Sequence, residues 1–153
     1  MNSVQLAPVI IGKLLNIGGM LQRYGNKILI PFDLNMQQFS IFFEIAKAEK
    51  VKQKELINRL LLEKPHVSKV VKKLHQMKLI TITASKEDKR SYWLAPTRKG
   101  LKLKEKCMEI FTKFNEDWME AVDDRQINSI LENLSHLQTV FKDKIREKDQ
   151  GIS

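Results

Sequence analysis

The fold is decided by one stretch in the middle of the chain, Lys64-Pro65-His66-Val67-Ser68-Lys69-Val70-Val71-Lys72-Lys73-Leu74-His75-Gln76-Met77. Pro65 suits the first turn of a helix, where its missing N–H would have had no partner. Four apolar residues recur at helical spacing and define one side of that helix: Val67, Val70, Val71 and Leu74. The other side carries basic and polar residues: His66, Ser68, Lys69, Lys72, Lys73 and Gln76. The stretch therefore predicts an amphipathic helix over residues 65–77 with a basic outer face.

Two β-prone runs follow this helix and form a hairpin. Residues 79–84 are rich in Ile and Thr with period-two alternation, and residues 92–95 form a second short run. The connecting tip, residues 85–91, is charged, and we expect at least one of Tyr92 and Trp93 in the core. A short helix over residues 53–61 precedes the basic helix after a brief link. Two short helices and a hairpin in this order predict a helix-turn-helix with a wing.

Longer amphipathic helices flank this module. Apolar residues at three- and four-residue steps predict helices over residues 6–24 and 36–48, with a turn at Lys50 and Val51. Thr97 suits the N-cap of a helix over residues 98–121, and Asp123 or Asp124 caps the next one. The predicted fold class is mainly α with a small β-hairpin wing.

The flanking helices also predict self-association. Residues 34–100 form the winged helix-turn-helix module, whereas residues 1–29 and 101–148 form helices with wide apolar faces that this small module cannot cover. Pairing with a second copy would bury those faces, and a two-fold dimer is the commonest closed form. We therefore expect residues 1–153 to form a single unit, in which N- and C-terminal dimerisation helices flank the module, and we expect the protein to act as a homodimer.

The positive charge is concentrated in the middle of the chain. The whole chain carries 27 Lys and Arg against 18 Asp and Glu, a formal net charge of +9. Residues 64–100 account for 10 − 2 = +8, whereas residues 101–153 give 9 − 11 = −2. A basic helix next to a basic wing tip indicates a polyanionic partner, with double-stranded DNA first. The alternative is a winged-helix module that binds other proteins or RNA, because a fold alone does not fix function.

Other function classes lack their motifs in this sequence. There is no Gly-rich phosphate loop, no nucleophile-elbow pattern and no His pair at metal spacing, so we expect neither an enzyme nor a cofactor or metal. The single cysteine, Cys107, favours a reducing cytoplasm and is expected to be a buried, inert thiol rather than a redox sensor. The apolar start is broken by Pro8 and Gly12 and is not expected to be a signal peptide. No segment is expected to reach membrane-spanning length, so we expect no membrane partner.

The order of elements from Leu34 to Leu103 resembles the multiple-antibiotic-resistance regulator (MarR) family of bacterial transcription factors. The match rests on several short pieces in order and at fitting spacing, whereas the flanking helices match in length and placement only. The matching pieces are Leu34 to Phe39, Lys54-Glu55-Leu56, Val67 to Leu74, Leu79-Ile80, Asp88-Lys89-Arg90, and Thr97-Arg98-Lys99-Gly100. The resemblance implies a sequence-specific DNA-binding transcriptional regulator, more often a repressor, that reads an inverted-repeat operator and is released by a small effector.

The resemblance also implies the DNA contacts. Arg90 would enter the minor groove, whose negative potential attracts a guanidinium, and Asp88 would hold the wing tip in shape. The expected DNA-binding residues are Pro65, His66, Ser68, Lys69, Lys72, Lys73, Lys86, Asp88, Lys89 and Arg90. Simpler interpretations remain for two of them, because Ser68 could face solvent and His66 could only start the helix.

The family further implies a small aromatic or phenolic effector. The candidate lining residues are Tyr24, Phe39, Met77 and Trp118, although aromatic residues at helical spacing are more often ordinary core.

Three positions depart from the family pattern. Lys78 replaces the usual glycine after the basic helix of residues 65–77, which would be the DNA-recognition helix, and the left-handed conformation there disfavours lysine. Lys52 replaces a capping Thr or Ser, and Pro96 replaces an apolar residue and is expected to shorten the second wing strand. These departures affect local geometry rather than the fold.

Overall fold

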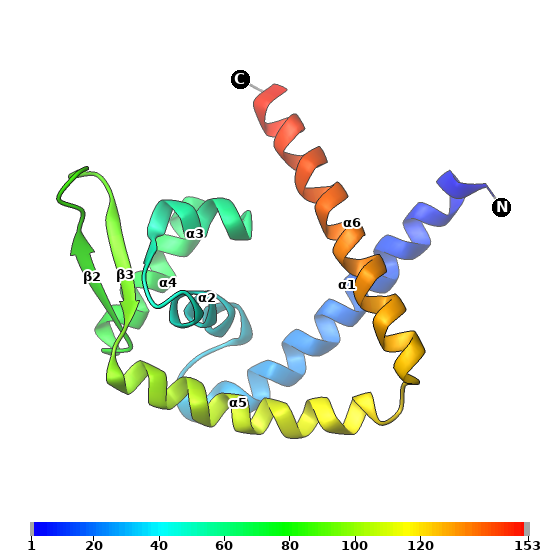
Figure 1. Ribbon diagram of the computed structural model, residues 1–153, viewed down its shortest axis with the longest axis horizontal. Helices are drawn as coiled ribbons and strands as arrows, with labels where there is room; N and C mark the ends of the chain where they lie inside the picture. Colours follow the sequence, from blue (N-terminus) through cyan, green and yellow to red (C-terminus); the bar gives the residue numbers. More distant parts are fainter. Residues whose placement is uncertain (1, 152–153) are drawn as a thin grey trace. The chain divides into compact units, whose positions relative to one another are not determined.

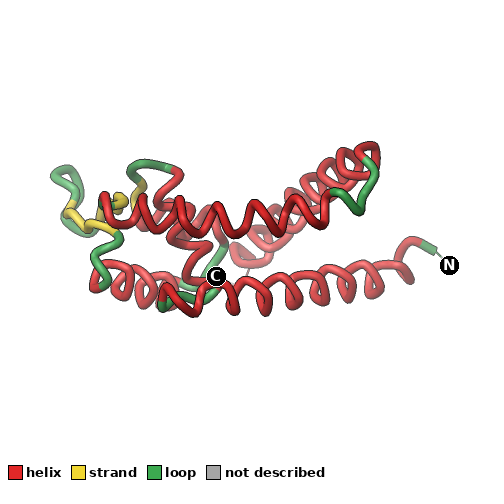
Figure 2. The backbone as a smooth tube through the Cα atoms, turned by 90° about the horizontal axis from the view of Figure 1, so that it is seen from below, coloured by secondary structure: helices red, strands yellow, loops and turns green. Residues whose placement is uncertain are grey.

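The computed structural model describes residues 2–151 and is mainly helical, with a small sheet (Figures 1 and 2). The chain divides into two compact units, Met1–Cys107 and Met108–Ser153, with the boundary inside one long helix. The elements of the chain, in order, are α1 (Ser3–Leu29), η1 (Ile30–Phe32), α2 (Met36–Lys47), β1 (Val51–Lys52), α3 (Gln53–Leu60), α4 (Lys64–Gln76), β2 (Ile80–Ala84), β3 (Tyr92–Pro96), α5 (Arg98–Met119) and α6 (Asp124–Gly151). The predicted fold class is confirmed.

Helix α1 packs on the rest of its unit mainly near its C-terminal end, against α2 and η1. Gly25 and Leu29 are its buried residues, and Gly25 lies so close to Met36 that an added Cβ would overlap the Met36 sulfur. The Asn26 side chain accepts a hydrogen bond of 2.7 Å from the backbone N–H of Met36, at the start of α2. None of residues 3–24 is buried, and many of them are apolar. The docked end thus positions a long apolar helix whose remaining surface is uncovered.

The helical segment of residues 3–32 is long and apolar enough to cross a membrane. The expectation that no segment reaches this length is therefore wrong, because α1 is longer than the periodicity predicted and continues into η1. Core helices of water-soluble proteins and signal sequences have the same composition, so this feature by itself does not identify a membrane protein.

Helix α2 lies at the centre of the core of the first unit. Its buried side chains include Phe39, Phe42 and Ile45, and its N-terminus is closed by a capping box between Asn35 and Gln38. The buried side of α4 contacts α2 and β2, and it consists of Val67, Val70, Val71 and Leu74, as the sequence predicts. This packing orients the other side of α4 outwards.

The sheet has three antiparallel strands in the order β1-β3-β2. Strand β1 was not predicted: residues Lys50 and Val51 were expected to form a turn, but Val51 pairs with Leu94, and both are buried. Two residues are too few for period-two alternation to be visible. The expected shortening at Pro96 is also wrong, because Pro96 is the last residue of β3 and lies opposite Ile80. The β2–β3 hairpin extends beyond the helices as the predicted wing (Figure 1).

A set of polar contacts joins the end of α4 to the start of α5. Lys78 adopts the left-handed conformation, with φ of 60°, in the position where the family has glycine. The Thr97 hydroxyl donates to the Lys78 carbonyl at 2.6 Å and accepts from the Gly100 N–H at 3.0 Å, which confirms Thr97 as the helix cap. The Lys99 ammonium donates to the Met77 carbonyl at 2.8 Å. A Cβ at Gly100 would overlap the Leu79 carbonyl oxygen, so this junction requires glycine there.

The second unit consists of the end of α5 and the whole of α6. Asp123 caps α6, since its carboxylate accepts from the Arg125 N–H at 2.8 Å and its own N–H donates to Gln126. Six large apolar side chains of α6 are exposed in the single chain: Ile130, Leu131, Leu134, Val140, Phe141 and Ile145.

The left-handed conformation of Lys78 predicts a stabilising substitution. Lys78→Gly should raise the free energy of unfolding by roughly 1 kcal/mol, because glycine adopts positive φ without the Cβ clash. Urea unfolding followed by circular dichroism, at one protein concentration, measures this. The matched control is Lys113→Gly, at an exposed position in the interior of α5, which should lower stability by about 1 kcal/mol. A loss of stability in both variants would contradict the interpretation.

Candidate nucleic-acid interface

The outward side of α4 is a narrow basic ridge. At about 3.6 residues per turn, four residues lie opposite the buried face. We call them the outer ridge: Pro65, Lys69, Lys72 and Gln76, all exposed. Lys69 and Lys72 form no ion pair with any carboxylate in residues 2–151. The outer ridge therefore presents two uncompensated cations on a rigid helix.

The predicted contacts Ser68 and His66 lie on opposite flanks of α4 and are half-buried. The Ser68 hydroxyl accepts a hydrogen bond of 3.1 Å from Gln53 at the start of α3. This bond links the two helices of the helix-turn-helix, so Ser68 does not simply face solvent. Gln53 was missed by the sequence reasoning, because nothing in the pattern shows which residue faces Ser68.

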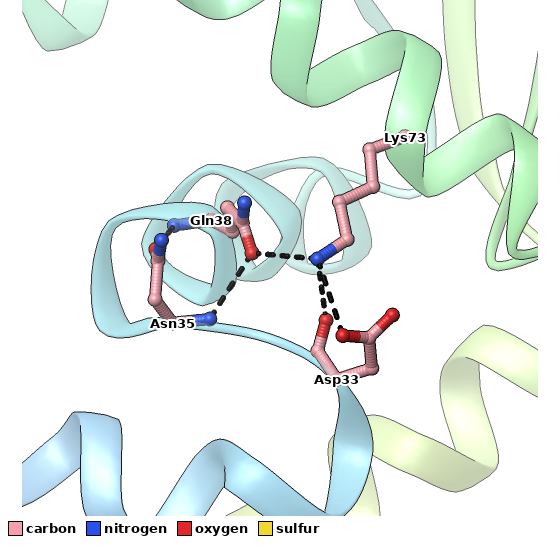
Figure 3. Close-up of polar contacts among 4 residues, drawn as sticks. All are labelled: Asp33, Asn35, Gln38 and Lys73. Atoms are coloured by element: carbon pink, nitrogen blue, oxygen red, sulfur yellow. Dashed lines mark hydrogen bonds and ion pairs between the residues drawn. The ribbon is translucent and has the colours of Figure 1, made fainter.

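The Lys73 ammonium forms hydrogen bonds within the protein. Figure 3 shows its ammonium directed at the connection between η1 and α2, where it donates to the Asp33 carbonyl at 2.6 Å and to Gln38 at 3.2 Å. The Asp33 carboxylate lies 3.7 Å away, and Asp33 itself has a left-handed backbone. Gln38 also accepts from the Asn35 N–H at 3.1 Å as part of the α2 cap. Lys73 thus differs from the outer ridge: it joins α4 to the chain entering α2.

The wing tip is a structured loop with exposed cations. Its predicted residues Lys86, Asp88, Lys89 and Arg90 are all exposed. The Asp88 carboxylate accepts from the Arg90 N–H at 3.0 Å, which is a local hydrogen bond of the kind expected for Asp88. The tip is closed at its base by buried Ser85, whose hydroxyl accepts from two backbone N–H groups at 3.3 and 3.4 Å. Ser85 was not singled out from the sequence, although a serine before a charged tip is a turn signal.

The outer face of the sheet adds two further cations. The ammonium groups of Lys50 and Lys52 lie 4.5 and 5.0 Å from the centre of the Trp93 ring, within cation–π range. Neither Tyr92 nor Trp93 is buried, so the expectation that one of them belongs to the core is wrong. The core residue of β3 is Leu94, which separates two outward positions. Lys50 and Lys52 were missed because their proximity depends on the unpredicted strand β1.

The four effector candidates differ in burial and are divided between the two compact units. Phe39 is 4% exposed and belongs to the core, whereas Met77 is half-buried at the end of α4. Tyr24 and Trp118 are exposed and lie in different compact units, and the Trp118 indole donates to Asn115 at 3.1 Å. The simpler interpretation, ordinary core, holds for Phe39.

The cysteine and the histidine His75 both lie against the protein interior or backbone. Cys107 is fully buried, and burial raises the pKa of its thiol to about 11, so the thiolate is disfavoured at neutral pH. The His75 ring lies 3.2 Å from the Ile80 carbonyl. Within residues 2–151, no three His, Cys, Asp or Glu side chains are grouped as metal ligands.

Comparisons with known proteins agree with this architecture. Residues 32–91 match the profile of the MarR family. The transcriptional regulator SarZ of Staphylococcus saprophyticus is 30% identical over 99 residues, which cover 62% of this chain and 68% of SarZ. SarZ of Staphylococcus aureus (strain USA300) is 27% identical over 116 residues, covering 75% and 76%.

Two solved structures show the same fold. A MarR protein from Peptoclostridium difficile superimposes with a TM-score of 0.85 at 21% identity, covering 94% of both chains. A mutant of MarR from E. coli, complexed with operator DNA, superimposes with a TM-score of 0.75 at 17% identity, covering 89% of this chain and 99% of MarR.

The contacts of Lys73 distinguish it from its neighbour on the outer ridge. Lys73→Met should lower the free energy of unfolding by about 1 kcal/mol, because it removes the hydrogen bonds to Asp33 and Gln38. Lys72→Met, the same change at an exposed position, should stay within about 0.5 kcal/mol of the unmodified protein. Urea titration at equal protein concentration measures both. Equal stability of the two variants would show that the Lys73 contacts contribute nothing.

Proposed function

The chain belongs to the MarR family of transcriptional regulators, and we propose that it binds a double-stranded DNA operator as a homodimer. Its relatives are transcriptional regulators rather than enzymes, which confirms the prediction that the chain is not an enzyme. The solved structures have the same winged helix-turn-helix fold as this chain.

The exposed cations of α4 and the wing tip are the observation that carries the DNA proposal. Lys69 and Lys72 on the outer ridge suit the major groove and its phosphates, while Arg90 suits the narrow minor groove. These groups lie on one compact unit, Met1–Cys107, and form no ion pair within residues 2–151. Binding would release counterions from DNA, so affinity would fall steeply with salt.

The uncovered apolar side chains support the homodimer. On α1 and α6 they form long continuous series, and contiguous apolar surface of this extent marks an interaction site. We propose that a second copy covers both helices. A two-fold dimer would place two recognition helices on half-sites about one helical turn, ~10 bp, apart.

The regulatory part of the proposal extends the family resemblance. We propose that the dimer represses transcription in the cytoplasm and that a small aromatic or phenolic effector releases it from an inverted-repeat operator. The protein- or RNA-binding alternative gains some support from Trp93 on the open face of the sheet, since RNA readers stack bases on such residues. However, the ammonium groups of Lys50 and Lys52 already lie over the Trp93 ring, where a stacked base would have to bind.

Neutralising one cation in each DNA-binding element tests the DNA proposal. Lys69→Gln combined with Arg90→Gln should weaken binding at least about tenfold and reduce the salt slope by about two, because each lost contact removes one counterion-releasing group. Fluorescence anisotropy of the duplex upstream of the protein's own coding region, at two salt concentrations, measures the loss against a shuffled duplex.

The matched control removes the same charge from α6, with Arg146→Gln and Lys148→Gln, both exposed. This variant should bind the upstream duplex as the unmodified protein does. If both variants lost the same affinity for the upstream duplex, the effect would be one of net charge alone. If the unmodified protein bound the upstream and shuffled duplexes equally, operator recognition would be contradicted.

The dimer proposal predicts twice the chain mass of 17.9 kDa in solution. Leu134→Glu should shift the protein towards the monomer, because it buries a carboxylate in the proposed interface. His136→Glu, on the opposite side of the same helix, is the control and should leave the mass unchanged. Light scattering after size exclusion measures the masses, and circular dichroism verifies folding. A monomeric unmodified protein at tens of micromolar would contradict the proposal.

A further inference from the structure

Two lysines share one aromatic ring on the outer face of the sheet. Lys52 in β1 lies directly opposite Trp93 in β3, and the ammonium groups of Lys50 and Lys52 lie 4.5 and 5.0 Å from the centre of its ring. We call Lys50, Lys52 and Trp93 the tryptophan cluster. Because exposed charges interact over about 10 Å in physiological salt, the two ammonium groups act on a partner as one concentrated charge.

The positive charge of the tryptophan cluster is not neutralised within the chain. Among the residues that the structure describes, no carboxylate lies within ion-pair distance of Lys50 or Lys52. The preceding residue, Glu49, has a left-handed backbone with φ of 59°, and the Lys50 N–H closes this turn on the Ala48 carbonyl at 2.6 Å. An aromatic ring attracts ammonium groups but has no net charge. Both positive charges therefore remain available to an anionic partner.

The tryptophan cluster lies between the two elements that we propose to enter the DNA grooves. At one end, Lys52 precedes Gln53, whose side chain donates to Ser68 of α4. At the other end, Trp93 comes two residues after Ser91, whose N–H and carbonyl both form hydrogen bonds that close the base of the wing tip. Helix α3 contacts both β1 and β3, which keeps these parts together. The cluster therefore belongs to the surface that joins α4 to the wing.

Neighbouring major and minor grooves of duplex DNA are separated by one sugar–phosphate strand. With α4 in the major groove and the wing tip in the next minor groove, that strand would cross the surface between them. We propose that Lys50 and Lys52 bind phosphates of this strand and that Trp93 positions their ammonium groups, an inference that rests on the proposed DNA-binding function. Such a contact strengthens binding to any duplex, because the backbone does not carry the base sequence.

The chemistry of the tryptophan cluster suits a phosphate. Each ammonium can donate a charge-assisted hydrogen bond to a phosphate oxygen, and it does so as a compact charge that needs no planar partner. A lysine side chain loses much conformational freedom when it is fixed, so holding both over Trp93 before binding reduces the entropy lost on binding. Trp93 is therefore a positioning residue, and the two lysines make the contact.

Fluorescence anisotropy of the full-length protein, with the upstream and the shuffled duplex over a range of salt concentrations, tests this contact. Lys50→Gln combined with Lys52→Gln should weaken binding of both duplexes by the same factor, roughly tenfold, and reduce the salt slope by about two. The matched control is Lys47→Gln with Lys104→Gln, whose ammonium groups lie 5.9 and 5.6 Å from the Phe43 ring and join α2 to α5 instead. This control removes the same charge from the same kind of contact and should change affinity less than about twofold.

Substitutions of Trp93 separate positioning from charge. Trp93→Leu keeps both lysines, so it should leave the salt slope unchanged and weaken binding of both duplexes about threefold, in line with an exposed cation–π contact. Trp93→Phe retains an aromatic face and should restore most of the affinity. Circular dichroism verifies that each variant is folded.

Each contrary result has a distinct meaning. If the Lys50/Lys52 variant bound both duplexes no more weakly than the Lys47/Lys104 control, the phosphate contact would be overturned while operator binding stood. If that variant lost affinity for the upstream duplex alone, the lysines would read sequence, and backbone contact would be overturned. Full binding by Trp93→Leu, or no rescue by Trp93→Phe, would overturn the positioning role of the ring. An unmodified protein that bound neither duplex would overturn the proposed function and this contact with it.

Discussion

Four apolar side chains of α4 are removed from water by packing on α2 and β2, and the outward direction of the basic residues follows from this contact. Burial of a Val or Leu side chain stabilises by about 1.5–3 kcal/mol, so together these residues outweigh any local preference of the exposed lysines. Because the helix cannot rotate without exposing Val67 and Leu74, the outer ridge keeps a fixed direction. A rigid helix of this kind is what recognition of a DNA groove requires.

Sequence periodicity was sufficient for the features that depend on this burial. The buried face of α4, the hairpin and the Thr97 cap all follow from residue type and spacing, and they agree with the structure. Strand β1 could not be found this way, because two residues show no alternation and its existence depends on pairing with Leu94. Trp93 was misplaced for the same reason, since the side of the sheet it faces is set by the register of β3.

The different roles of the lysines of α4 also could not be predicted from the sequence. Lys72 and Lys73 are adjacent and chemically identical, yet one is exposed and the other reaches the Asp33 carbonyl. Only the path of the chain between η1 and α2 distinguishes them, and that path contains a left-handed aspartate that no periodicity reveals. Similarly, Lys99 reads as one more basic residue in the sequence, but it closes the last turn of α4 through Met77.

The attachment of α1 has a mechanical consequence. A helix of 27 residues is about 40 Å long at 1.5 Å per residue, and its buried residues, Gly25 and Leu29, and the hydrogen bond of Asn26 to α2 all lie at one end. Such a helix behaves as a lever pivoting on the N-terminus of α2, where a tilt of about 5° would move the far end by roughly 3.5 Å over that length. In a dimer joined through α1, the separation of the two recognition helices would be set at this pivot, by a methionine sulfur resting on a glycine.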